Sequence, residues 1–167
     1  MHDDIREVLK KAYQIEVDGY TFYSMAAERA EKPVVQELFD KLANDEVQHK
    51  AYLKSVIGSY EDKGAAAFTI ARRDPDLKAF TDTIYTEAFR EQARDADFEI
   101  GVLSIGMTLE TRAIQYFSNA AKAARETEVK EFYQVLADWE KGHLDALQKL
   151  YGGVREDYWA EGGFSPF

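Results

Sequence analysis

The sequence predicts an all-α fold, an antiparallel four-helix bundle made of two repeated helical hairpins, with a long crossover that contains an extra helix. Apolar residues recur at alternating steps of four and three, which is the period of an amphipathic helix. A shift of 94 positions aligns residues 3–53 with residues 97–147 without a gap, and 15 of the 51 aligned pairs are identical. Repetition over this length indicates a duplicated supersecondary unit.

The first hairpin is predicted from two periodic runs at about residues 4–30 and 34–57. Asp3 is a suitable N-cap for the first run, because its carboxylate can accept hydrogen bonds from the free amides of the first turn. Pro33 suits the first turn of the second run, where its missing N–H costs nothing.

The second hairpin is predicted at about residues 98–124 and 128–151. Asp97 and Thr127 are the corresponding N-cap candidates. Gly152–Gly153 is expected to end the fourth helix, because two successive glycines are poor helix formers.

Between the hairpins lies a connecting segment, residues 58–96, in which Asp74–Pro75 is typical of a helix start. The bundle should therefore occupy residues 1–152 as one domain. Residues 153–167 form a tail that is too aromatic for an inert linker, and we expect it to pack on its own bundle, on a dimer mate or on a partner protein.

Composition excludes several classes of function. A net charge of −10 without a Lys/Arg cluster argues against nucleic acid and anionic membranes as partners. The chain has no cysteine, which excludes disulfides, thiolate zinc sites, iron–sulfur clusters and thiol catalysis, so any metal must rest on oxygen and nitrogen ligands. The charged start and the lack of a long apolar run predict a cytoplasmic protein without a membrane span.

Two Glu-x-x-His pairs each follow a lone glutamate by 30 positions. The six residues are Glu16, Glu46, His49, Glu110, Glu140 and His143. All six stand on the apolar stripes of their helices, where a solvated charged pair would not be placed. Each glutamate is 15 positions from the centre of its hairpin, so all four carboxylates should lie about 22 Å from their turns, at one level of the bundle.

Buried carboxylates at one level would lose solvation and repel one another, so they need a counter-charge. Two divalent cations would balance the four carboxylates, and the two neutral imidazoles would complete the ligand set. We therefore predict a site for two metal ions that is at once the catalytic site. Oxygen and nitrogen ligands suit iron, our choice, or manganese, and they do not exclude zinc.

The pattern extends beyond the six ligands to four longer motifs. These are Ile15-Glu16-x-x-Gly19-x-x-Phe22-Tyr23, Asp45-Glu46-x-x-His49, Leu109-Glu110 with Tyr116-Phe117, and Glu140-x-x-His143. They resemble the motifs of the ferritin-like di-iron carboxylate proteins, in particular of the rubrerythrin-related branch that lacks a rubredoxin domain. The resemblance covers nearly the whole chain.

That resemblance implies one histidine per metal, with Glu46 and Glu140 as bridging ligands and Glu16 and Glu110 as terminal ones. Proteins of this kind commonly oxidise ferrous iron or reduce peroxide or oxygen. Without cysteine to hold a rubredoxin iron, the electron donor is expected to be a separate molecule.

Two positions depart from the family pattern. Met107 stands where rubrerythrins carry an additional glutamate one turn before Glu110, and Tyr13 stands where many ferritin-like proteins place the glutamate of the first helix. The geometry of the site and its peroxidase chemistry are therefore expected to differ from those of the relatives.

Several side chains near the ligands have two interpretations. Four aromatic residues could relay electrons or simply fill the core, and these are Tyr20, Tyr23, Tyr116 and Trp139. Asp45 and Asp138 are candidates for orienting the imidazoles from behind.

The predicted function is a di-iron oxidoreductase, acting on ferrous iron with oxygen or hydrogen peroxide and assembled as a homodimer. Two alternatives stay open. One is a non-catalytic iron-binding, iron-delivery or cargo protein, and the other is a metal-free helical interaction module.

Overall fold

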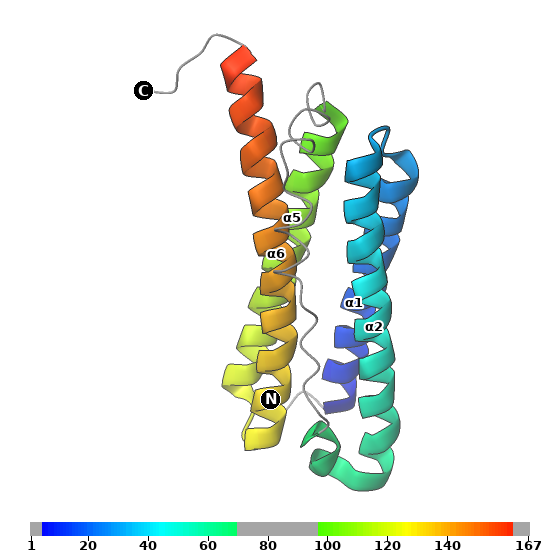
Figure 1. Cartoon of the computed structure of the whole chain (residues 1–167). Coiled ribbons are helices and arrows are strands. Elements are labelled where there is room, and N and C mark those ends of the chain that lie inside the picture. Colours follow the sequence, from blue (N-terminus) through cyan, green and yellow to red (C-terminus); the bar gives the residue numbers. More distant parts are fainter. Residues whose placement is uncertain (1–4, 70–96, 162–167) are drawn as a thin grey trace.

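The computed structural model describes residues 5–69 and 97–161, and this part of the chain is helical throughout apart from short turns. Its elements are α1 (Ile5–Arg29), α2 (Pro33–Lys63), the 3-10 helix η1 (Gly64–Thr69), α5 (Asp97–Ala123) and α6 (Thr127–Glu161). Helices α1 and α2 form one hairpin and α5 and α6 the other, and the four pack side by side as a bundle (Figure 1). The predicted all-α four-helix bundle is confirmed.

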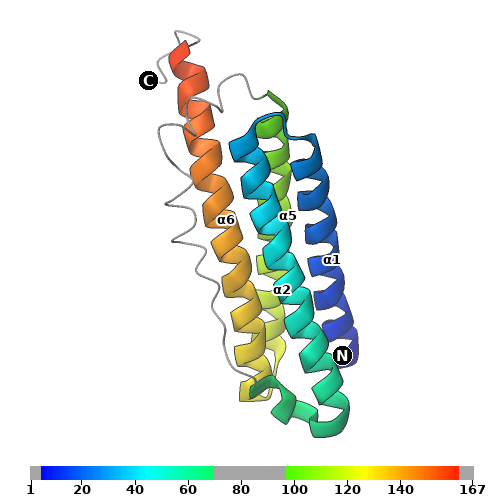
Figure 2. The same cartoon turned by 45° about the vertical axis from the view of Figure 1, so that its right-hand side comes forward.

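The two hairpins point in opposite directions. The α1–α2 turn lies at one end of the bundle and the α5–α6 turn at the other, as both views show (Figures 1 and 2). Helix α5 therefore begins at the end opposite to η1, and the chain between them has to connect the two ends of the bundle. The extra helix expected from Asp74–Pro75 lies outside the described residues.

Two helices are longer than predicted. Helix α2 continues through Gly58, and the glycine that follows its last residue is Gly64, whose φ of 56° is readily adopted only without a Cβ. Helix α6 runs through Gly152–Gly153 to Glu161, so the expectation that these glycines end it is wrong. A glycine in a helix costs only about 1 kcal/mol relative to alanine, which the rest of a long helix can offset.

The starts of the helices agree with the sequence patterns to within a residue. Pro33 is the first residue of α2, as predicted. Asp97 and Thr127, expected just before their helices, are the first residues of α5 and α6. Asp3 lies outside the described residues.

The apolar core consists of two clusters, one on each side of the mid-bundle level. The cluster toward the α1–α2 turn includes Phe39 and Leu42, and the cluster toward the α5–α6 turn includes Phe117 and Leu136. Phe68 of η1 extends the second cluster and closes that end of the bundle. None of the helices in the described ranges is both long and apolar enough to cross a lipid bilayer.

Candidate metal centre

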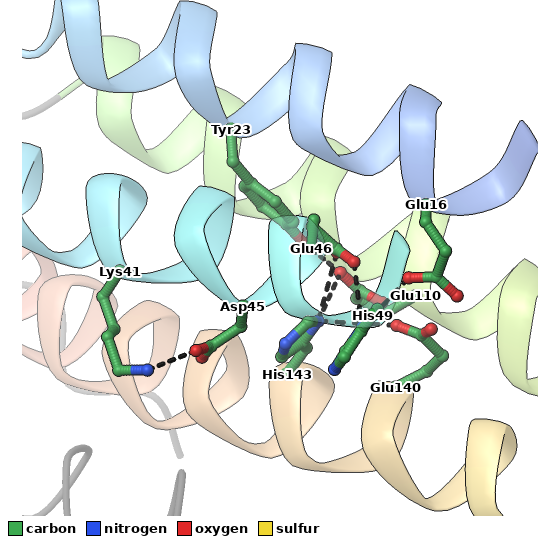
Figure 3. A network of polar contacts seen from close by, with 9 residues as sticks. All are labelled: Glu16, Tyr23, Lys41, Asp45, Glu46, His49, Glu110, Glu140 and His143. Carbon is green, nitrogen blue, oxygen red and sulfur yellow. Dashed lines mark hydrogen bonds and ion pairs between the residues drawn. The ribbon is translucent and has the colours of Figure 1, made fainter. Parts of the chain in front are cut away.

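The six predicted ligands meet between the two apolar clusters, in the middle of the bundle (Figure 3). Helices α1 and α5 supply one glutamate each, and α2 and α6 supply one glutamate and one histidine each. Every one of the six is at most 3% exposed. The heptad-like stripes that bury the neighbouring leucines also bury these polar residues, because they occupy the same faces of the helices.

His49 directs its Nδ1 atom at two carboxylates. Nδ1 lies 3.0 Å from Oε2 of Glu16 and 3.1 Å from Oε2 of Glu46. The ring is stacked on His143, with the two ring centroids 5.2 Å apart.

His143 faces three carboxylates with the same ring atom. Its Nδ1 lies 3.4 Å from Oε1 of Glu46, 3.4 Å from Oε2 of Glu140 and 3.5 Å from Oε1 of Glu110. Both imidazoles thus point Nδ1 toward the carboxylates and Nε2 away from them. The two oxygens of Glu46 divide between the two histidines.

The ligand atoms form two overlapping groups of four residues, in each of which they lie within 4.8 Å of one another. One group is Glu16, Glu46, His49 and Glu140, and the other is Glu46, Glu110, Glu140 and His143. Glu46 and Glu140 belong to both of these groups, whereas each remaining residue belongs to one of them. Glu46 also forms a group of three with His49 and His143. Such an arrangement can hold two cations side by side with two carboxylates between them.

Two of the carboxyls resist ionisation. Burial raises the pKa of Glu16 to about 8, and the negative charge of Glu46 adds to this rise. Burial also raises the pKa of Glu140 well above its ordinary value, with further contributions from the charges of Glu16 and Glu110. In the absence of a cation both groups therefore favour the protonated form, since a charged carboxylate would be neither solvated nor compensated.

For His143 and Glu110, neighbouring opposite charges affect the pKa more than burial does. Burial alone would lower the pKa of His143, but the negative charges of Glu46 and Glu110 raise it well above its ordinary value. Burial alone would raise the pKa of Glu110, but the charge of His143 lowers it. Protonation of His143 would thus partly neutralise the carboxylates of the metal-free site, as a cation would.

The donor set fits a pair of metal ions. Several of its buried atoms have no hydrogen-bond partner among the described residues, and these are Glu16 Oε1, Glu140 Oε1, His49 Nε2 and both ring nitrogens of His143. Buried polar atoms without partners are costly, and coordination by carboxylate oxygens and imidazole nitrogens would satisfy them. Iron, manganese and zinc all accept such a mixture of ligands.

Two residues of α1 lie against glutamates of other helices, which the sequence patterns did not predict. Tyr23 donates a hydrogen bond to Glu110, and burial keeps the pKa of Tyr23 well above its ordinary value, so its hydroxyl remains a donor. Gly19 leaves room for Glu46, since a Cβ at Gly19 would come within 2.7 Å of Glu46 Oε1. The signal for Tyr23 was its place two turns after Glu16 on the same stripe.

The remaining aromatic candidates differ in position. Trp139 stacks on the His49 ring, with centroids 4.4 Å apart and an interplanar angle of 10°. Tyr116 is only half-buried and contacts Phe117, while Tyr20 is on the surface under the Lys50 ammonium. Trp139 is thus next to a candidate ligand, whereas Tyr20 belongs to the outer face.

The two acidic candidates, Asp45 and Asp138, differ in burial. Asp45 is fully buried on α2 and accepts a hydrogen bond from Lys41 (Figure 3). Asp138 is exposed on α6, where Lys141 and Gln134 contact it. Only Asp45 is placed to act on the interior.

Comparison with known families supports the interpretation of the six buried residues as a metal site. The sequence profile of the rubrerythrin family matches residues 7–151, which include both hairpins and all six candidate ligands. Searches among curated proteins and among solved structures gave no significant match. A match over most of the length, together with buried Glu and His groups suited to metal, shows that this chain is a member of the rubrerythrin family.

Proposed function

We propose that the six buried residues bind two iron ions and that the loaded protein is an oxidoreductase. The observation that carries the proposal is the pair of overlapping ligand groups, which share Glu46 and Glu140. A single metal site would not need two histidines that each aim Nδ1 at a different set of carboxylates and have only Glu46 in common. Membership of the rubrerythrin family supports the assignment to iron.

In this proposal each metal position has its own pair of ligands. Glu16 and His49 serve one position, Glu110 and His143 serve the other, and the two shared glutamates lie between them. This division agrees with the bridging and terminal roles that the family resemblance implies.

The chemistry would follow from the position of the site. Two adjacent iron ions, each able to change by one electron, would supply the two electrons that reduce oxygen or hydrogen peroxide while ferrous iron is oxidised. The chain contributes four carboxylates that neutralise the metal charge, and two apolar clusters that keep bulk water out. A separate donor would return the electrons.

Tyr23 has a distinct part in this arrangement. Its hydroxyl donates to an oxygen of Glu110, which fixes the carboxylate and leaves the other oxygen for a metal. Because the pKa of Tyr23 is raised by burial and by the Glu110 charge, the hydroxyl keeps its proton when the carboxylate is ionised. It therefore orients a ligand without adding a charge.

Metal content tests the site. The protein would be loaded anaerobically with Fe²⁺, freed of excess ion and analysed by elemental analysis beside the variant Glu46→Gln/Glu140→Gln. We expect about two metals per chain in the unmodified protein and a large loss in the variant, because both shared carboxylates are removed. Glutamine keeps the shape of glutamate, so a loss of metal would not reflect a cavity.

The matched control is Glu37→Gln/Glu131→Gln. These glutamates are also a repeat pair on α2 and α6, but both are exposed. The control should bind as much metal as the unmodified protein. Equal metal content in all three proteins, or none in any of them, would refute the proposed centre.

Activity is tested separately from binding. Stopped-flow mixing of the Fe²⁺-loaded protein with oxygen or hydrogen peroxide should give oxidation faster than for free Fe²⁺, with turnover when a reductant is present. Tight binding without turnover would support the alternative, a non-catalytic iron-binding or iron-delivery protein.

A further inference from the structure

The two repeats differ in the residue that directly precedes each Glu-x-x-His pair, beside the site. The residue before each Glu-x-x-His pair is Asp45 on α2 and Trp139 on α6, and these two positions correspond under the 94-residue shift. Both side chains are buried. The two halves of the site therefore have the same ligands but different neighbours.

On one side the neighbour is an aromatic ring. Trp139 lies parallel to His49 at 4.4 Å between ring centroids, and Tyr52 packs edge-on against Trp139. An indole has no hydrogen-bond acceptor. In keeping with this, Nε2 of His49 is buried without a partner in the described part of the chain.

At the corresponding position of α2 the residue is Asp45, whose carboxylate can accept a further hydrogen bond. Oδ1 of Asp45 accepts from Lys41, whereas Oδ2 is buried and has no hydrogen-bond partner within the described ranges. In the view of Figure 3 the Asp45 carboxylate lies between Lys41 and the His143 ring. Nε2 of His143, which points away from the ligand carboxylates, is also buried without a partner.

Lys41 adds to the difference between the halves. Its ammonium is part-buried beside the fully buried Asp45, and it compensates the charge of that carboxylate. The corresponding position on α6 is Val135, so the second hairpin has neither the acid nor the cation. An acid paired with a cation therefore precedes the Glu-x-x-His pair of the first hairpin and is absent from the second.

We infer that Asp45 is a positioning residue for His143 and that the two metal positions consequently differ in affinity. With Nδ1 of His143 bound to metal, Nε2–H would donate to Oδ2 of Asp45, which satisfies both unpartnered atoms. A carboxylate behind a ligand imidazole fixes its tautomer and makes it a stronger ligand. The His143 position fills first and the His49 position second. This inference rests on the proposed metal centre.

Anaerobic titration with Co²⁺, followed by its visible absorption and by calorimetry, tests the order of filling. The unmodified protein should bind in two steps that differ by about tenfold or more in dissociation constant. Asp45→Asn should weaken the tighter step by roughly 10- to 100-fold and leave the weaker step unchanged. A residue with a merely structural role would affect both steps together.

The matched control is Asp138→Asn, which removes the same charge from an exposed position on α6 close to the site. It should leave both steps unchanged. His143→Ala should abolish the tighter step and His49→Ala the weaker one, which assigns the steps to the two halves. Helix content and thermal unfolding of each metal-free variant establish that it is folded.

A second readout is independent of affinity. In ¹⁵N-histidine NMR spectra of the Zn²⁺-loaded protein, the Nε2–H proton of His143 should be shifted downfield and exchange slowly, and Asp45→Asn should remove both properties. Two equal steps, or a tighter step that survives His143→Ala or Asp45→Asn, would overturn the inequality while leaving the metal centre intact. Failure of the unmodified protein to bind Co²⁺ or Fe²⁺ would overturn both.

Discussion

Individual side chains decide whether the carboxylates can occupy the middle of the bundle. Gly19 is the clearest case. It lies within a helix, and glycine is required there because Glu46 occupies the space that a side chain would fill, not because the backbone needs it. The corresponding residue on α5 is Ala113, so only the Glu46 side has this extra room. Glu46 is also the carboxylate that faces both histidines.

Gly19→Ala should therefore weaken metal binding. The new Cβ would lie 2.7 Å from Glu46 Oε1, so Glu46 has to move. Equilibrium dialysis with Mn²⁺ should show at least about a tenfold loss of affinity, as for other changes that displace or release a ligand. In Gly101→Ala the Cβ meets open space, and this control should keep its affinity and gain about 0.5–1 kcal/mol in unfolding free energy. Equal affinity in both variants would contradict the steric argument.

Tyr23→Phe tests the hydrogen bond to Glu110. Removal of the hydroxyl leaves a buried carboxylate oxygen without its donor, which should lower the unfolding free energy of the metal-free protein by about 1–3 kcal/mol. Tyr133→Phe is the matched control, since the Tyr133 hydroxyl is buried but has no hydrogen-bond partner in the described chain. Urea unfolding in the presence of a chelator measures both. A larger loss in Tyr133→Phe than in Tyr23→Phe would contradict the assignment.

The sequence was sufficient to bring the six candidate ligands together, because their spacing and their apolar stripes fix both level and face. It did not distinguish Asp45 from Asp138, since Asp45 directly precedes one Glu-x-x-His pair and Asp138 stands two positions before the other. The 100° turn between adjacent helical positions places Asp45 inside and Asp138 outside. Contacts between helices, such as that of Tyr23 with Glu110, depend on packing angles that a sequence repeat does not specify.

At the scale of the helices, the ends were the least predictable features. The sequence predicts helix ends at Gly58 and at Gly152–Gly153, but a continuous helix runs through both sites. Glycine lowers helix stability by a small amount and does not prevent the backbone hydrogen bonds. Gly64 does end a helix, since its positive φ gives the chain a conformation unfavourable for other residues.

Each hairpin also has to hold its ligands through packing, and the repeat offers two equivalent places to test this. Leu42 and Leu136 are fully buried, one turn before Glu46 and Glu140. Leu→Ala at either place should lower the unfolding free energy by about 2–5 kcal/mol while two metals still bind, because the cavity removes no ligand. Val47→Ala, at an exposed position of α2, should change the free energy by less than about 0.5 kcal/mol. Denaturant titration with parallel metal analysis measures both effects, and loss of metal without loss of stability would contradict this separation.

The whole molecule combines a stable apolar frame with an unfavourable polar centre. Two apolar clusters lie on either side of four carboxylates and two histidines, and the opposed hairpins bring these groups together from both ends. In the metal-free protein the centre stays compatible with folding because it retains protons. Metal ions would replace these protons, so folding, metal binding and pH are linked.

The sign of that linkage follows from Glu16. Its pKa is about 8 in the folded protein, compared with an ordinary value of 4.5. At pH values between these two, the folded chain holds a proton that the unfolded chain has lost. The raised pKa values of Glu140 and His143 act in the same direction. The unfolding free energy of the metal-free protein must therefore fall as the pH rises through this window. Glu110, whose pKa is lowered, acts in the opposite direction but only at more acidic pH.

Thermal unfolding between about pH 5 and pH 8 in a chelator should show this fall, whereas Mn²⁺-loaded protein should not, because bound metal keeps Glu16 ionised in the folded state, as it is in the unfolded chain. Glu16→Gln, which cannot titrate, should flatten the fall in the metal-free protein. Each pKa unit of difference corresponds to about 1.4 kcal/mol, so the effect is well above the error of the measurement. A metal-free protein whose stability does not fall from pH 5 to pH 8 would show that the buried carboxylates are ionised without a cation, and the electrostatic argument for the metal pair would fail.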